Sequence, residues 1–98
     1  MYFVVFTTDK PNSLALREAT RPEHLKYLGA HTQAVKLIHG GPTLSEADET
    51  MNGTLIIAEA ESIQAVQDLM AGDPYSKAGL FEDVQIRPWV WGLGNPKN

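Results

Sequence analysis

YFVVFTT, residues 2–8, decides how this chain folds, because it carries β-branched and aromatic residues on both of its alternating faces. A strand of this kind is expected in the middle of a sheet that is covered on both sides. A second such stretch, TLIIAEA, follows at residues 54–60. The sequence therefore predicts a sheet with two central strands and apolar side chains on each face.

The segment after the first strand carries signals for a helix. Ser13 can cap a short turn, and TRPE at residues 20–23 combines a capping box with proline in the first helical turn. We therefore expect the helix to begin near Pro22 and to end between Ala34 and Lys36. Apolar residues recur at helical spacing along this segment, at Leu25, Leu28, Val35 and Ile38.

Glycine and polar residues then interrupt the chain. Residues 37–44 are predicted to form a short second strand with a break at Gly40-Gly41-Pro42, and residues 45–52 a mobile hairpin loop that Gly53 closes. The glycine pair lacks the surrounding pattern of a phosphate-binding or dinucleotide-binding loop. A bulge or a sharp turn is therefore the preferred interpretation of these glycines.

A second helix and a fourth strand follow the strand at residues 54–60. Ser62 caps the helix, and Gly72 ends it. Asp73-Pro74-Tyr75 is predicted to be a turn, and the fourth strand contains Pro88, which indicates an edge strand or a bulge. The apolar stripe of the helix comprises Ile63, Val66, Leu69 and Met70.

The resulting order βαββαβ predicts an α+β, ferredoxin-like antiparallel sheet with both helices on one face, in a single domain over residues 1–98. A second copy of the chain is the simplest cover for the other apolar face, so we expect a homodimer in which Trp89 and Trp91 anchor the contact. Residues 92–98 are expected to be partly disordered or to cross the dimer surface.

Composition narrows the classes of function. The net charge of −4 argues against nucleic acid and anionic membranes as partners, and the absence of cysteine excludes disulfides and thiol chemistry. No apolar run reaches the ~20 residues of a membrane span. The first strand lacks a basic leader and is followed by Asp9, unlike a signal peptide. A cytoplasmic protein without a membrane partner is expected.

The predicted topology brings chemically useful residues to one end of the sheet. The start of the first helix, with Arg21 and His24, and the exit of the second, with Asp73 and Tyr75, should meet there, although 49 positions separate His24 from Asp73. Gly41 should lie nearby, and Tyr75 should line the cavity. The sequence thus predicts a polar pocket at this end.

A histidine next to an aspartate can act as a general base. The carboxylate of Asp73 would fix the tautomer of His24 and stabilise its imidazolium, while the other ring nitrogen accepts a proton. The helix N-terminus would oppose the imidazolium. Arg17 and Arg21 could hold a carboxylate or an enolate beside the ring.

Structural roles remain open for the same residues. A histidine early in a helix is often a surface or capping residue, and Asp-Pro is a common turn former. No metal is expected, because His24 and His31 lie two turns and about 10 Å apart and His39 adds no tight ligand spacing. No cofactor is expected either, since the chain lacks a dinucleotide fingerprint and an axial-ligand context for haem.

Taken together, these features resemble the YciI-like, or YCII-related, family. The resemblance runs nearly end to end, and the combination is more specific than any one motif. The residues that carry it are Arg17, Arg21-Pro22-Glu23-His24-Leu25, Gly41-Pro42, Gly53, Asp73-Pro74-Tyr75, Ala78-Gly79-Leu80-Phe81 and Arg87-Pro88-Trp89.

The resemblance implies a dimeric α+β barrel and an active site built on a His and an Asp, which here match His24 and Asp73. It also implies, for some branches, lyases that remove halide from chlorinated aromatic diols. We therefore expect an enzyme that uses this pair for acid/base chemistry on a small anionic or phenolic molecule, a lyase among the options. The rival hypothesis is a non-catalytic binding or accessory module, and the loop at residues 45–52 leaves specificity undefined.

Overall fold

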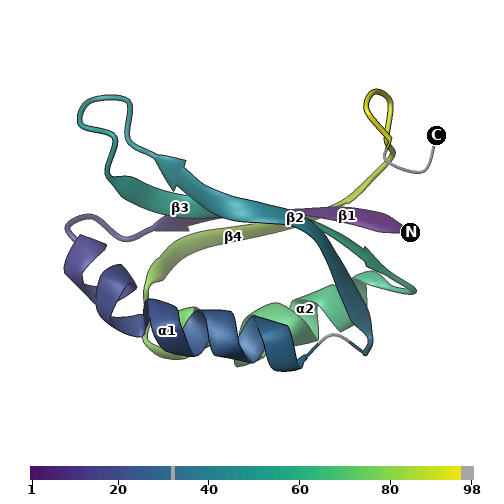
Figure 1. Ribbon diagram of the computed structural model, residues 1–98, viewed down its shortest axis with the longest axis horizontal. Helices are drawn as coiled ribbons and strands as arrows, with labels where there is room; N and C mark the ends of the chain where they lie inside the picture. The colour runs from purple at the N-terminus through teal and green to yellow at the C-terminus, as the bar shows by residue number, and fades with distance from the viewer. Residues whose placement is uncertain (32, 96–98) are drawn as a thin grey trace.

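The structure, a computed structural model, describes residues 1–31 and 33–95 as a twisted sheet with helices packed below it (Figure 1). Among these residues, no helix is both long and apolar enough to cross a membrane. The elements in chain order are β1 (Tyr2–Asp9), α1 (Leu14–Ala30), β2 (Val35–Leu44), β3 (Met51–Ala60), α2 (Ile63–Gly72), α3 (Pro74–Lys77) and β4 (Phe81–Trp89).

The four strands are antiparallel and lie in the order β2-β3-β1-β4, with α1 and α2 on one face of the sheet (Figure 1). β1 and β3 are the central strands, and β4 pairs with β1 at an edge, where Pro88 lies opposite Phe3. The predicted α+β ferredoxin-like fold and the edge position of the proline-containing strand are confirmed.

The first helix is longer at its start than the sequence suggested. α1 begins at Leu14, not near Pro22, and Pro22 lies inside it. Proline cannot donate the backbone hydrogen bond of a helix interior and usually bends the helix there. Figure 1 shows such a bend partway along α1. The prediction was wrong because Pro22 marks a bend and not a start.

The same helix also ends earlier than predicted. α1 stops at Ala30, and the backbone N–H of His31 caps it by donating to the carbonyl of Tyr27. Val35, which was assigned to the helix, begins β2 and pairs with Ala60. Its β-branched side chain is buried in the apolar core that the sheet shares with α2, so strand pairing overrides the helical spacing. Thr32 of the predicted helix lies outside the described residues.

The glycine pair does not break β2, which continues through Gly40 and Gly41 to Leu44. The pairing of β2 with β3 shifts register on either side of them, between Leu37 and His39 and again between Thr43 and Leu44. β3 begins at Met51, so Gly53 lies inside the strand and does not close the loop.

The second helix matches the prediction, whereas the turn after it does not. The Ser62 side chain accepts a hydrogen bond from the backbone of Ala65 at the start of α2, which ends at Gly72. The predicted turn at residues 73–75 is the start of a short helix, α3. Asp73 caps it, and Pro74 occupies its first turn.

One face of the sheet packs on the helices, and the other is open. Alternate residues of β1 point inward, starting with Phe3 and Val5. The open face, defined here by the cross-strand pairs Phe6–Leu55 and Val4–Ile57, carries partly exposed apolar side chains. After β4 the chain turns to this side of the sheet, as the yellow segment of Figure 1 shows. The ring of Trp91 contacts those of Tyr2 and Trp89 edge-on. The tail at residues 92–98 was expected to be partly disordered or to cross the dimer surface. Its residues 96–98 lie outside the described residues.

Candidate active site

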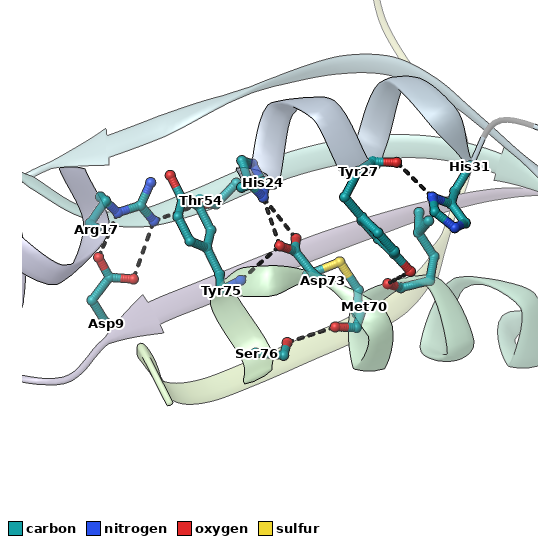
Figure 2. A network of polar contacts seen from close by, with 11 residues as sticks. Asp9, Arg17, His24, Tyr27, His31, Thr54, Met70, Asp73, Tyr75 and Ser76 are labelled. Atoms are coloured by element: carbon teal, nitrogen blue, oxygen red, sulfur yellow. Dashed lines mark hydrogen bonds and ion pairs between the residues drawn. The ribbon is translucent and has the colours of Figure 1, made fainter. Parts of the chain in front are cut away.

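His24 and Asp73 meet in the interior, between α1 and the start of α3 (Figure 2). The His24 Nδ1–H donates to Asp73, at 2.8 Å from Oδ1 and 2.9 Å from Oδ2. His24 is 6% exposed and Asp73 is fully buried. Because an ionised carboxylate only accepts hydrogen bonds, this contact places the hydrogen on Nδ1 and leaves Nε2 as the free position of the ring.

Asp73 is fixed by the chain on either side of it. Its Oδ1 accepts a hydrogen bond from the backbone N–H of Tyr75 at 2.9 Å, which caps α3. The helix before it approaches α1 closely, since a side chain at Gly72 would overlap the hydroxyl of Tyr27. That hydroxyl donates to the carbonyl of Leu69 at 2.8 Å. The close approach of the two helices therefore holds the carboxylate against His24.

Tyr75 stacks flat on His24, with ring centroids 3.9 Å apart and an angle of 13° between the planes. Burial raises the pKa of the Tyr75 hydroxyl above its ordinary value, against the opposing charges of Arg17 and Arg21. The phenol is therefore neutral across the physiological range. No hydrogen bond of this hydroxyl is found within the part of the chain that the structure describes.

Arg17 lies on the other side of the Tyr75 ring, with its Cζ 4.8 Å from the ring centroid. Its Nε donates to Asp9 at 2.7 Å, and its Nη2 donates to Asp9 at 3.2 Å and to the Thr54 hydroxyl at 2.7 Å. Figure 2 shows the resulting row of Arg17, Tyr75 and His24, with Asp9 and Asp73 at its two ends.

A cavity of about 300 Å³ opens beside this row. The volume is at the lower end of the range for small-molecule sites. Polar groups of Arg21, His24 and Tyr75 face it on one side, and Gly41 lies in its β2 wall. The apolar residues that line it are Leu25, Leu28, Leu37, Ile38, Pro42 and Ile56. The cavity suits a small molecule with a flat apolar part and polar substituents.

The structure gathers every residue predicted for the site. Arg17, Arg21, His24, Tyr75 and Gly41 line the cavity, and Asp73 lies behind His24. One electrostatic argument was wrong: α1 begins at Leu14, so His24 sits in the middle of the helix, where the terminal dipole does not act.

The other two histidines differ in their relation to the cavity. The ring of His31 stacks on Tyr27 outside it, whereas His39 is part of its β2 wall and has its ring edge-on to Trp91 at 6.1 Å. Within residues 1–31 and 33–95, no three His, Cys, Asp or Glu side chains form a group that could hold a metal ion.

The sequence reasoning missed Asp9 and Thr54. Both lie on the inward face of the sheet, where Thr7 pairs with Thr54 and Asp9 follows two residues later. The alternation of β1 contained a signal, because it places Asp9 on the same face as Phe3 and Val5. A carboxylate on a buried face needs a cationic partner, and Arg17 is the one that reaches it.

Comparison with known proteins gives one consistent family. The description "YCII-related domain" matches residues 1–90. An uncharacterised protein of Haemophilus influenzae is 37% identical over 91% of this chain and 96% of its own length. Protein YciI of Escherichia coli is 34% identical over 91% of this chain and 96% of its own.

A solved structure adds a chemical precedent. It is a 5-chloro-2-hydroxyhydroquinone dehydrochlorinase, TftG, of Burkholderia phenoliruptrix in complex with 2,5-dihydroxybenzoquinone. It superimposes with a TM-score of 0.82 and 34% identity, over 92% of this chain and 94% of the other.

Proposed function

The chain belongs to the YCII-related domain family, and on that premise we propose that it is an enzyme using His24 and Asp73 for general acid/base chemistry on a small phenolic or anionic molecule. The observation that carries the proposal is the orientation of one ring. Nδ1 of His24 is held by a fully buried carboxylate, while the ring faces a cavity with an apolar wall.

The chemistry follows from that orientation. Nε2 of His24 takes the proton of a ligand hydroxyl, and Asp73 stabilises the imidazolium that forms. The ligand is left as an oxyanion. On a polyhydroxylated ring that carries a halide, the oxyanion pair moves through the ring, and the imidazolium returns the proton to the carbon that bears the halide, which gives a keto tautomer. Loss of the proton of a second hydroxyl then expels the halide as an anion and leaves a quinone, which is a lyase-type outcome. The dehydrochlorinase of similar structure supports this outcome by its named activity.

Arg21 is the group that we assign to the negative charge of the ligand. It is exposed on the cavity wall one turn before Leu25, and it has no hydrogen-bond or ion-pair partner among the described residues. A guanidinium presents a planar pair of donors that matches an oxyanion or a carboxylate. Tyr75 lines the cavity as a neutral donor, and the lack of a side chain at Gly41 leaves the β2 wall open.

We also propose that the chain works as a homodimer formed through the open face of the sheet. Phe6 is 43% exposed there and Leu55 41%, and the two are cross-strand neighbours. Burial of this apolar surface by a second copy would remove it from water. Light scattering should then give twice the 10.8 kDa of one chain, and Phe6→Glu should give single chains that keep their fold. A wild-type mass of 10.8 kDa would refute this part.

Turnover by single variants tests the enzyme. We expect His24→Ala to lower turnover of 5-chloro-2-hydroxyhydroquinone, measured as chloride release, by about 10²- to 10⁴-fold. The matched control is His31→Ala at the C-cap of the same helix, because the ring of His31 lies outside the cavity. Circular dichroism checks that both variants are folded. Equal turnover by wild type and His24→Ala would refute the proposal.

The rival hypothesis is a binding module in which His24 and Asp73 only tie α1 to α3. The burial of Asp73 and its role as the cap of α3 favour it. Under this hypothesis, Asp73→Asn should cost about 1 to 3 kcal/mol of stability. An enzyme should instead show a smaller loss or a gain, because functional sites often sacrifice stability. Binding of 2,5-dihydroxybenzoquinone without any turnover would support the module.

A further inference from the structure

Arg17 differs from Arg21 because a carboxylate of the protein is paired with its charge. Its side chain is almost fully buried, and the Asp9 carboxylate bonds two of its nitrogens. An opposite charge in direct contact cancels most of the field that a cation exerts further away. A ligand anion in the cavity would therefore gain less from Arg17 than from the unpaired Arg21. Only Nη1 of Arg17 has no hydrogen-bond partner among the described residues.

The face of the guanidinium has a different use. It lies over one face of the Tyr75 ring, and His24 lies flat on the opposite face, 3.9 Å away. The backbone of Tyr75 is fixed by its hydrogen bond to Asp73, so the ring is held at its base and on both sides. The Nδ1 contact with Asp73 fixes one edge of the imidazole, and the stack fixes its plane.

We infer that Arg17 is a positioning residue and not a ligand-binding one. Its guanidinium holds the Tyr75 ring in contact with His24, and this contact sets the direction of His24 Nε2. Asp9 and Thr54 hold the guanidinium in the orientation that this contact requires. The inference deepens the proposed function, on which it rests for its meaning in catalysis. The packing itself exists without a ligand and is tested without one.

The first experiment is a double-mutant cycle read by NMR in the free protein. A ring stacked on His24 shifts the His24 ring protons upfield, and Tyr75→Leu removes that shift. We expect Arg17→Lys, which keeps the charge beside Asp9 but loses the planar face, to move the same signals toward their position in Tyr75→Leu. Made in the Tyr75→Leu background, Arg17→Lys should add nothing, because the effect passes through the ring.

The second experiment compares two probes by calorimetry. Hydroquinone is uncharged at neutral pH, and 2,5-dihydroxybenzoquinone is anionic. A positioning residue affects both alike, so Arg17→Lys should raise the two Kd values by the same factor. If Arg17 instead bound the anion, lysine would largely take over that role, and Arg17→Met would weaken the binding of the anionic probe selectively.

Arg87→Lys is the matched control, because Arg87 lies on the exposed edge strand and, within residues 1–31 and 33–95, forms a hydrogen bond only with Gln85. It should change neither the His24 signals nor the Kd values. The inference is refuted if Arg17→Lys leaves the His24 signals in place, or if it shifts them equally with and without Tyr75. If neither probe binds the wild type, the proposed ligand class fails, while the NMR cycle still decides the role of Arg17.

Discussion

The inward face of β1 contains two regions of opposite character. At one end Phe3 and Val5 pack against apolar side chains of α2, and at the other Thr7 and Asp9 lie among the charges of the site. The two ends share a strand, a sheet face and a degree of burial. The difference shows that burial has two roles in this strand. At one end buried apolar contacts stabilise the fold, and at the other the buried charged groups are held in fixed positions.

The largest effect should come from breaking the polar end. Arg17→Met leaves Asp9 buried without its partner, and we expect a loss of about 3 to 5 kcal/mol in the free energy of unfolding, measured with urea. Replacing both residues, in Asp9→Leu with Arg17→Met, should recover most of it, because no charge is then stranded. Equal losses in the single and the double variant would contradict this account of the pair.

The apolar end should respond differently. Val66 is fully buried in α2 within the apolar cluster. Val66→Ala should lower the unfolding free energy by about 2 kcal/mol, from lost burial and the remaining cavity. The His24 ring signals and the Kd for 2,5-dihydroxybenzoquinone should stay unchanged in the folded molecules. A change in either readout would mean that the two ends are not independent.

Thr7 marks the boundary between the two ends and should give a smaller effect of opposite sign. Its hydroxyl is buried, and it finds no hydrogen-bond partner in residues 1–31 and 33–95. Valine has the same shape without the polar atom. We expect Thr7→Val to raise the unfolding free energy by up to about 1 kcal/mol in urea titration. A loss of stability would show that this hydroxyl does have a partner in solution.

The smallest effect concerns alkaline pH. Burial is the main cause that raises the pKa of both Tyr75 and Tyr27 above 10.0. The two hydroxyls contribute fully to stability while the pH is below their pKa in the unfolded chain. This contribution is lost as the pH rises through their higher pKa in the folded protein. Stability should therefore fall from about pH 10 upward. Tyr75→Phe with Tyr27→Phe should fall less steeply, and an identical slope would contradict the assignment.

Sequence reasoning predicted the fold well where a pattern had one physical meaning. The strands around Val5 and Ile56, and the helix that Ser62 caps, depend on local burial and capping, and all three are present, although β3 starts earlier than predicted, at Met51. Pro22 and Val35 were misread because each has two meanings. Proline in a helix starts it or bends it, and a β-branched residue at helical spacing becomes a strand residue once a neighbouring strand pairs with it.

The sequence predicted only part of the site, and the reason is different. The topological argument paired His24 with Asp73 by placing His24 at the start of the first helix, whereas His24 lies in the middle of α1 and meets Asp73 where α3 begins. The stack of Tyr75 between Arg17 and His24 depends on the packing of α3, which appeared in the sequence as a turn. Asp9 was overlooked because its place on the buried face becomes informative only when the phase of β1 is followed to its end.

The distance along the chain between His24 and Asp73 has a consequence for folding. The two side chains are 49 positions apart and lie in opposite halves of the sequence. Closing so long a loop costs conformational entropy. Contacts offset this cost only after segments far apart in the sequence have docked. Nascent α1 thus emerges with Arg17 and His24 unable to find Tyr75 and Asp73. The pair can form only after the start of α3 has docked on α1.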